Sequence, residues 1–151
     1  MSAAPPAELA LFARLTRFLV IGSQAVALQR PDLLRAPPSD TDLLVEPSAL
    51  NQLAARLQIA GFALTIWDAA MRPPFSARQL RGRWYVRARR DRVTIDLTYE
   101  CPWLDFATSW ARRVVVGGVP TAHLDDVAAL IAQRDRPGDA EYAALLRAQS
   151  Q

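Results

Sequence analysis

The sequence predicts an α+β fold, an α/β mixed sheet flanked by helices with further helices at the C-terminus. Three observations predict it. Short apolar runs alternate with helical patterns early in the chain, a β-hairpin pattern follows, and two helical stretches close the sequence. Because 151 residues are enough for one core but few for two, we expect a single domain over residues 1–151.

The first part of the chain predicts a strand–turn–helix unit. Residues 7–16 have the apolar spacing of a helix, and residues 17–21 form an apolar run typical of a short buried strand. A Gly-Ser turn then precedes residues 25–29, which are able to open a helix. Three prolines indicate a loop over residues 30–39.

The middle of the chain predicts two further strands with a helix between them. Residues 41–46 are almost continuously apolar, as in a strand covered on both faces. The helix over 49–60 ends before Gly61, a residue favoured at the C′ position, and residues 62–67 form the third strand. The proline- and arginine-containing stretch 68–82 is interpreted as a loop.

A hairpin and several C-terminal elements complete the prediction. Residues 84–89 and 92–99 are strand-like runs joined by the polar turn around Arg90 and Asp91, typical of a β-hairpin. The later elements are expected in this order: a short helix within 101–110, a strand with a Gly117–Gly118 turn within 112–122, a helix from Leu124 and a last helix over 139–149.

Composition excludes several classes of protein. The chain has 51% apolar and 22% charged residues, which is typical of a globular domain and not of disorder. Its single cysteine, Cys101, excludes a disulfide scaffold, and a reducing cytoplasmic location is expected. No apolar run reaches the ~18–20 residues of a membrane helix, and the first residues lack a secretory signal pattern. All 18 basic residues are arginines, and the net charge is only +3.

Three aspartates stand where a metal site would form. Asp40 and Asp42 lie two residues apart at the mouth of the second predicted strand, so on an extended chain their side chains project to one face, about 6.5–7 Å apart at Cα. Asp96 alternates with Ile95 and Leu97, which places it on the polar face of the fifth strand. Carboxylates grouped in this way hold divalent cations such as Mg²⁺ or Mn²⁺. If the second and fifth strands are neighbours, the three aspartates meet.

The Gly22–Ser23 turn predicts a phosphate site. Glycine lets the backbone approach a ligand closely, and the N–H groups at the start of the following helix attract phosphate. Ser23 adds a hydroxyl donor, although it is equally suited to capping the helix.

Taken in order, these motifs resemble the nucleotidyltransferase superfamily related to DNA polymerase β. The resemblance rests on Gly-Ser within FLVIGSQAVAL, on SDTDLLV beginning at Ser39, and on the single aspartate of the later IDL stretch. The C-terminal segment, where a Leu-Ile helix precedes Arg-Pro-x-Asp, is also similar, and the likeness spans about residues 17–146. Similar proteins include small bacterial abortive-infection and toxin–antitoxin nucleotidyltransferases.

The resemblance implies a metal-dependent enzyme that moves a nucleotidyl group from an NTP, such as ATP, to a hydroxyl acceptor and releases pyrophosphate. Asp40 and Asp42 would hold Mg²⁺ or Mn²⁺ at the nucleotide phosphates, and Asp96 would ligate the catalytic metal and activate the acceptor. The acceptor would be RNA, a protein or a small molecule. The residues implied to bind the nucleotide are Gly22, Ser23 and Ser39.

Two other functions stay open. The first is a non-catalytic interaction protein on the same fold, such as one component of a toxin–antitoxin pair with a helical partner. The second is an arginine-rich RNA-binding domain without chemistry, because Arg87 and Arg89 share a strand face and could contact phosphates. The alternative for these arginines is a hairpin face exposed to solvent. Binding to a membrane is not expected.

The remaining candidates favour structural roles. A lone histidine before a helix, His123, is more often structural than catalytic, and most of the tryptophans and tyrosines are expected in the core or a groove wall. The pair Asp40 and Asp42 has the alternative of a solvated loop. One group is compatible with either an ion-pair network or a nucleotide contact: Arg134, Arg136 and Asp139.

Overall fold

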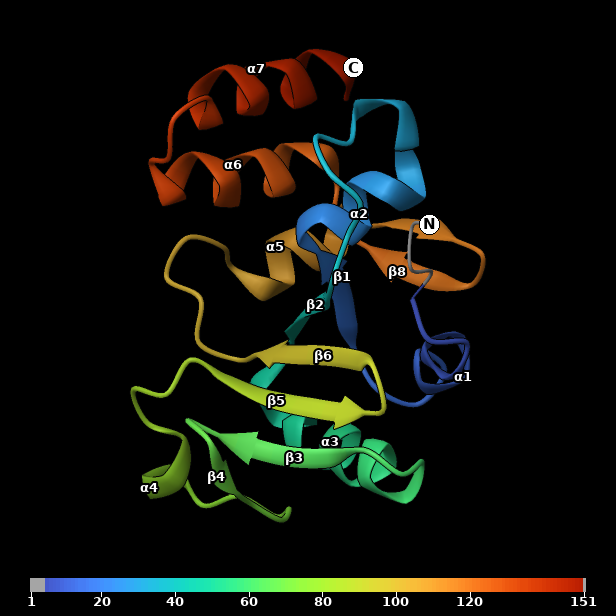
Figure 1. Cartoon of the computed structure of the whole chain (residues 1–151), viewed down its shortest axis with the longest axis vertical. Coiled ribbons are helices and arrows are strands. Elements are labelled where there is room, and N and C mark those ends of the chain that lie inside the picture. Colours follow the sequence, from blue (N-terminus) through green and yellow to red (C-terminus); the bar gives the residue numbers. More distant parts are fainter. Residues whose placement is uncertain (1–4, 151) are drawn as a thin grey trace.

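The computed structural model describes residues 5–150, in which helices and strands alternate along most of the chain (Figure 1). The helices are α1 (Glu8–Phe12), α2 (Gly22–Gln29), α3 (Leu50–Ile59), α4 (Ala77–Leu80), α5 (Phe106–Ala111), α6 (Leu124–Arg134) and α7 (Asp139–Gln149). The strands are β1 (Phe18–Ile21), β2 (Thr41–Val45), β3 (Ala63–Ile66), β4 (Ala69–Ala70), β5 (Tyr85–Arg90), β6 (Val93–Thr98), β7 (Val114–Val116) and β8 (Val119–Thr121). Two 3₁₀ turns are η1 (Pro31–Leu33) and η2 (Pro47–Ala49).

The strands of the described chain form one eight-stranded sheet in the order β4-β3-β5-β6-β2-β1-β8-β7. Strand β2 is antiparallel to β1 and parallel to β6, and β1 is parallel to β8. The other neighbouring pairs are antiparallel. This mixed sheet with helices confirms the predicted α+β class.

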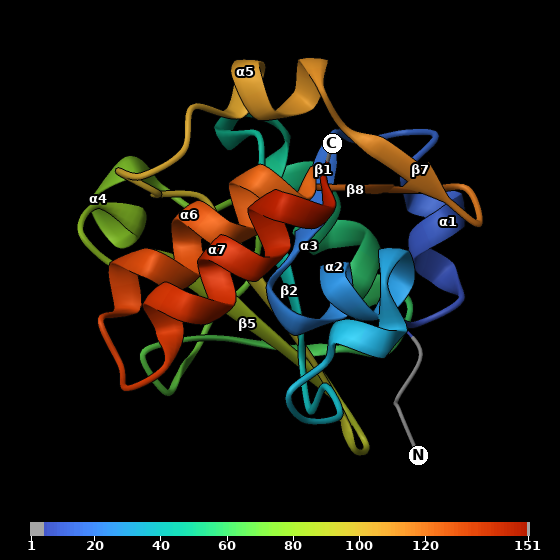
Figure 2. The same cartoon turned by 90° about the horizontal axis from the view of Figure 1, so that it is seen from above.

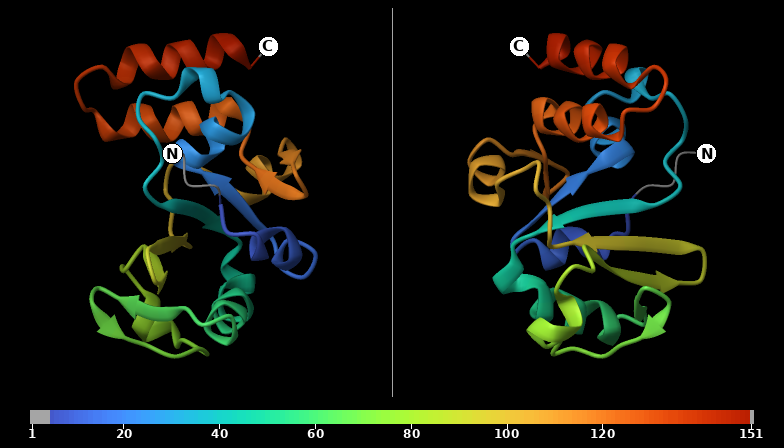
Figure 3. Two further views of the ribbon diagram at one scale, coloured as in Figure 1. Left: turned by 45° about the vertical axis from the view of Figure 1, so that its right-hand side comes forward. Right: turned by 90° about the vertical axis from the view of Figure 1, so that its left-hand side faces the viewer.

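The C-terminal helices and the outer hairpins lie at opposite ends of the molecule. Helices α6 and α7 stack side by side at one end, and β3, β4 and β5 with α3 lie at the other (Figures 1 and 3). Strands β1 and β2 run between the two ends, and the view from above shows α5 and α7 on different sides of α6 (Figure 2). Helix α2 packs against both β2 and α6, so the Gly-Ser turn lies next to the central strands.

The core explains why these residues form these elements. All four residues of β1 are buried, as expected of a central strand. On β6, Ile95 and Leu97 are fully buried, and each contributes roughly 1.5–3 kcal/mol by burial. Helix α3 buries Leu50, Leu53 and Leu57 along one face. The alternation on β6 therefore keeps its polar residues on the opposite face, as predicted.

Most of the predicted elements are confirmed, and several boundaries match closely. The last helix spans the predicted residues 139–149, and Gly61 follows α3 with a φ of +95°. The β7–β8 hairpin turns at Gly117 and Gly118, both with positive φ. No helix within residues 5–150 is both long enough and apolar enough to cross a membrane.

Three expectations about local structure are corrected. The first helix ends at Phe12 rather than 16, because the N–H groups of Arg14 and Leu15 donate to carbonyls only three residues back (3.2 and 3.0 Å) and the chain continues in turns. The predicted loop 68–82 contains β4 and α4, whose start is a capping box between Ser76 and Gln79. The helix expected within 101–110 begins only at Phe106, because Asp105 caps its first turn.

Candidate active site

Asp42 and Asp96 are direct register partners on the adjacent parallel strands β2 and β6. Partners in one register project to the same face of the sheet, so the two carboxylates meet on its polar side. Asp96 is 9% exposed, and both residues line one cavity of about 400 Å³. The condition set by the sequence analysis, that the second and fifth predicted strands are neighbours, is therefore met.

Crowding of negative charge changes the acidity of Asp42. Burial first, and then the charges of Asp96 and Asp40, raise the pKa of Asp42 to about 6, although Arg87 opposes the shift. Asp40 lies in the bend just before β2 and is half-buried. All three predicted aspartates therefore influence one small volume, and a cation placed there would relieve their repulsion.

Arg87, for which the sequence left open a phosphate contact or a solvated face, instead binds the carboxylate of Asp96. Arg87 on β5 is the register partner of Asp96. Its Nε and Nη2 donate to the two oxygens of Asp96 at 2.8 and 2.9 Å. This bidentate pair raises the pKa of the Arg87 guanidinium further above its ordinary value. Arg87 therefore gives the buried carboxylate of Asp96 a counter-charge within the fold.

Gly22 brings the backbone of α2 against Asp42. It has a φ of +67°, and a Cβ added there would lie 2.9 Å from Oδ2 of Asp42. Only glycine fits this close approach without strain. Ser23 is the second helical residue and is exposed, and α2 has Ile21 at its N-cap position. The alternative that Ser23 caps the helix is therefore wrong.

The remaining predicted residue, Ser39, meets Ser23 at a second cavity of about 210 Å³. Gly22 also lines it, as do the side chains of Arg35 and Arg134. The N-terminus of α2 opens here, and its free N–H groups attract anions. The three residues predicted to bind nucleotide thus share one basic cavity on the α2 side of the aspartates.

A buried aspartate that sequence reasoning left undecided holds both arginines of this cavity. Asp139 accepts from Nη2 of Arg35 at 2.9 Å and from Nη2 of Arg134 at 3.0 Å. Burial opposes ionisation of Asp139, but these hydrogen bonds outweigh it and lower its pKa to about 2. Arg136 contributes its backbone N–H alone (3.2 Å). The group is an ion-pair network, and it fixes two cations at the edge of the cavity.

The larger cavity, between the sheet and α6, is partly aromatic. Trp84 and Trp103 line it with their rings 5.7 Å apart and tilted, and each is more than 40% exposed. Glu100 also lines this cavity and accepts from the N–H of Gly82 (2.8 Å). An aromatic wall beside two carboxylates is suited to a planar ring attached to a phosphate chain.

A divalent cation fits part of this donor set. The hard oxygens of Asp40 and Asp42, with the raised pKa of Asp42, match the ligand preference of Mg²⁺. Within residues 5–150, however, no three His, Cys, Asp or Glu side chains are grouped as a metal cluster. The aspartates therefore fit a cation that completes its shell with water and substrate phosphates, as Mg²⁺ commonly does.

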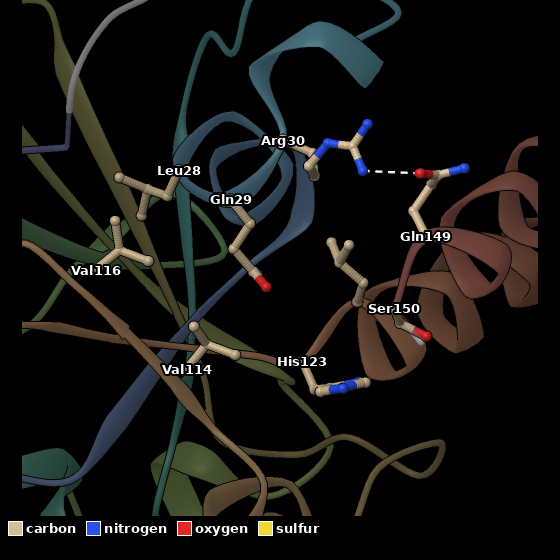
Figure 4. Close-up of a pocket in the computed structure, with 9 residues that line it drawn as sticks. Leu28, Gln29, Arg30, Val114, Val116, His123, Gln149 and Ser150 are labelled. Atoms are coloured by element: carbon tan, nitrogen blue, oxygen red, sulfur yellow. Dashed lines mark hydrogen bonds between the residues drawn. The ribbon is translucent and has the colours of Figure 1, made fainter.

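Another cavity, of about 380 Å³, lies at the far end of α2 and contains none of the predicted site residues (Figure 4). Arg30, at its edge, already donates to Gln149 at 2.8 Å and pairs with Asp32 at 2.7 Å. His123 also lines it, and its Nδ1 accepts from the N–H of Asp125 (3.1 Å), so this histidine caps α6. The structural role expected for His123 is confirmed.

Fold and site together define a mixed α+β domain with an acidic pair beside the glycine that begins α2. Among solved structures, the chain is similar to the solution structure of the antibiotic-resistance factor ANT(2'')-Ia. The two share 15% sequence identity with a TM-score of 0.55, over 93% of this chain and 84% of that chain. No model of a known protein family and no curated protein matches the sequence.

The protein has the DNA polymerase β-like nucleotidyltransferase fold, and the resemblance seen in the sequence motifs is confirmed at this level. ANT(2'')-Ia is an aminoglycoside nucleotidyltransferase. At this low identity the likeness concerns the fold, and the toxin–antitoxin relationship stays a prediction.

Proposed function

We propose that the protein is a metal-dependent nucleotidyltransferase that moves a nucleotidyl group from an NTP to a hydroxyl acceptor. The observation that carries the proposal is the pairing of Asp42 with Asp96 on adjacent strands, against the close backbone approach of Gly22. Two carboxylates that face each other raise the pKa of Asp42 to about 6, which disfavours the charged form. A purely structural role would not require this arrangement.

The triphosphate is assigned to the basic cavity. Ser23 and Ser39 supply hydroxyl donors, and Arg35 and Arg134 supply cations that Asp139 already holds in place. Arginines fixed in this way lose little conformational freedom on binding phosphate. The nucleoside then extends into the aromatic cavity beside Trp84 and Trp103.

The reaction is a displacement at the α-phosphorus. The acceptor oxygen forms a bond to this phosphorus, the bond from the phosphorus to the bridging oxygen of the β-phosphate breaks, and pyrophosphate leaves. The hydroxyl proton would pass to the carboxylate of Asp96, to which the resemblance assigns activation of the acceptor. Mg²⁺ held by Asp40 and Asp42 would stabilise the charge that develops on the phosphate oxygens.

A transfer assay tests the proposal. Each α-³²P-labelled NTP is incubated with Mg²⁺ and with RNA, protein or aminoglycoside acceptors, and the label transferred to the acceptor is counted. The released pyrophosphate carries no label and is measured in a separate assay. We expect label transfer by the wild type, loss of at least 100-fold in Asp42→Asn and Asp96→Asn, and no loss in Arg147→Ala, an exposed residue of α7. Equal activity in Asp42→Asn with an intact fold would contradict the proposal.

One observation favours a second candidate, a non-catalytic protein on the same fold. Arg87 engages both oxygens of Asp96 and so occupies the position of a cation. In that case the fold would serve an interaction alone, such as one half of a toxin–antitoxin pair. Absence of Mg²⁺-dependent NTP binding by the folded protein would support this candidate over the first.

A further inference from the structure

The polar face of β3 and β5 carries chemistry that the proposed reaction does not use. The register pairs Ala63 with Arg89 and Thr65 with Arg87 across the two strands. Residues two apart on a strand share a face, so Arg87 and Arg89 project to the same side as Asp96. Val86 and Ala88, which alternate with these arginines along β5, are fully buried on the opposite face of the sheet. A short basic row therefore leads away from the catalytic carboxylates.

A cavity of about 400 Å³ lies along this row. Thr65, Trp67, Asp68, Tyr85 and Arg87 line it. Tyr85 also lines the aromatic cavity that contains Asp42 and Asp96, so the two cavities adjoin. A molecule bound along β5 would therefore reach Asp42 and Asp96 past Tyr85.

Trp67 is presented at the end of this cavity at a conformational cost. It and Asp68 form the two-residue turn between β3 and β4, with φ values of +47° and +66°. Turns of this kind prefer Asn-Gly or Asp-Gly, and a bulky residue in the left-handed region is strained. Such strain tends to persist at functional sites.

The indole of Trp67 is nevertheless held in place. It is 60% exposed and lines the cavity, in agreement with the expectation that most tryptophans lie in the core or in a groove wall. Its Nε1 donates to the carbonyl of Arg83 (3.2 Å), and the Arg83 guanidinium lies 4.4 Å from the ring centroid. A fixed, exposed aromatic ring next to a cation is a stacking platform.

The charges on this face favour an anionic ligand. Among residues 5–150, neither Arg83 nor Arg89 lies within ion-pair distance of a carboxylate. Arg90, on the opposite face, is by contrast paired with Glu8 at 2.7 Å. Of the residues that the structure describes, Asp68 is the one carboxylate that lines the cavity. A polycationic aminoglycoside would meet the arginine row as like charges.

We propose that this face binds a single-stranded nucleic acid, with a base stacked on Trp67 and the backbone phosphates on Arg83 and Arg89. Aromatic stacking combined with a basic track is the general way in which proteins hold single strands. The inference rests on the proposed function, because it identifies the acceptor as the terminal hydroxyl of this strand.

Fluorescence anisotropy with a 5′-labelled 12-nucleotide single-stranded RNA of mixed sequence tests the proposal. We expect Trp67→Ala to weaken binding roughly tenfold and Trp67→Phe to retain most of it, because stacking needs a flat ring. Arg89→Ala should reduce the slope of log K against log [salt] by about 0.7, the value for one phosphate contact to a single strand. Arg147→Ala, on α7, serves as the matched control and should bind like the wild type. Thermal unfolding of each variant verifies its fold.

The outcomes separate this inference from the proposed function, because Mg²⁺–NTP binding is titrated in the same variants. Unchanged RNA binding in Trp67→Ala, or equal weakening in Arg147→Ala, would overturn the inference even if NTP binding persists. Weaker NTP binding with unchanged RNA binding in Trp67→Ala would also overturn it, since the platform would then serve the nucleotide. RNA binding that depends on Trp67 supports the proposal that this face binds a single strand, even if no NTP binds. In that case only the proposed transferase activity fails.

Discussion

Asp42 and Asp96 face each other across β2 and β6, and Arg87 holds Asp96 from the next strand. Three charged groups on three neighbouring strands thus form one unit. The arginine neutralises one carboxylate and leaves the other with a raised pKa. The unit is consequently asymmetric: Asp96 is stabilised within the fold, and Asp42 is the group that gains from an added cation.

The first prediction concerns Asp42→Asn. Because its pKa is raised to about 6, the native state binds this proton more tightly than the unfolded chain, and the cost of ionisation appears as the pH rises from about 4 to about 6. Without metal, in EDTA, the variant should be more stable than the wild type at pH 7.5 by up to about 3 kcal/mol. This gain should vanish at pH 4. Thermal unfolding at the two pH values measures it, and an equal change at both would refute the assignment.

The second prediction concerns Arg87→Ala, which leaves the carboxylate of Asp96 buried without its partner. We expect a loss of about 2 kcal/mol in the free energy of unfolding at pH 7.5, measured by urea denaturation. Arg89→Ala, an exposed neighbour on the same strand, should change stability by less than about 0.5 kcal/mol. Similar losses in both variants would show that the pair with Asp96 has no special role.

The third prediction separates backbone strain from steric contact at Gly22. Gly22→Ala and Gly82→Ala both place a side chain at positive φ, +67° and +72°, but only the first meets an atom within 4 Å, Oδ2 of Asp42. Each should cost about 1 kcal/mol from strain. Only Gly22→Ala should also weaken Mg²⁺–NTP binding, by at least tenfold. Calorimetric titration compares them, and matched NTP affinities would contradict the close approach to phosphate.

The fourth prediction concerns the network of Asp139. Its folded-state pKa of about 2 lies below the ordinary value of 3.8, so its contribution to stability is present above pH 4 and is lost as the pH falls toward 2. Asp139→Asn should flatten the decline of stability in this range. The exposed turn variant Asp91→Asn should keep the wild-type decline. Chemical denaturation as a function of pH checks this, and an unaltered profile in Asp139→Asn would count against the network.

The strand faces on which Asp42 and Asp96 lie could be predicted because they depend on local patterns, whereas the pairing of β2 with β6 is a long-range contact and was only a condition of the prediction. Alternation along residues 93–98 decides the face of Asp96, and an almost wholly apolar run marks β2 as a central strand. The fold class likewise follows from the order of such patterns.

The pair of Arg87 with Asp96 was not predicted because it depends on the register between β5 and β6. A turn centred on Arg90 and Asp91 would place Tyr85 opposite Asp96, whereas the observed register pairs Arg90 with Val93 and therefore Arg87 with Asp96. A slip of one residue in a turn changes the partner of every residue in a hairpin. A positive φ at Asp91 fixes the observed turn, and aspartate is one of the residues that tolerate it.

An ion-pair network of Asp139 with Arg134 was one of the two alternatives that the sequence offered, but the contact with Arg35 was beyond sequence reasoning because Arg35 is 104 residues away. No local periodicity reports such a contact. The start of helix α4, by contrast, could have been predicted from the sequence, since Ser76 and Gln79 have the spacing of a capping box.

The most direct test of the central claim is calorimetric titration of the protein with ATP, CTP, GTP and UTP, with and without Mg²⁺, in the wild type and in Asp40→Ala/Asp42→Ala. The account predicts that at least one NTP binds only with Mg²⁺ and that the double variant, while folded, loses this binding. Binding that is equal in the double variant, or absent from the folded wild type for all four nucleotides, would contradict it.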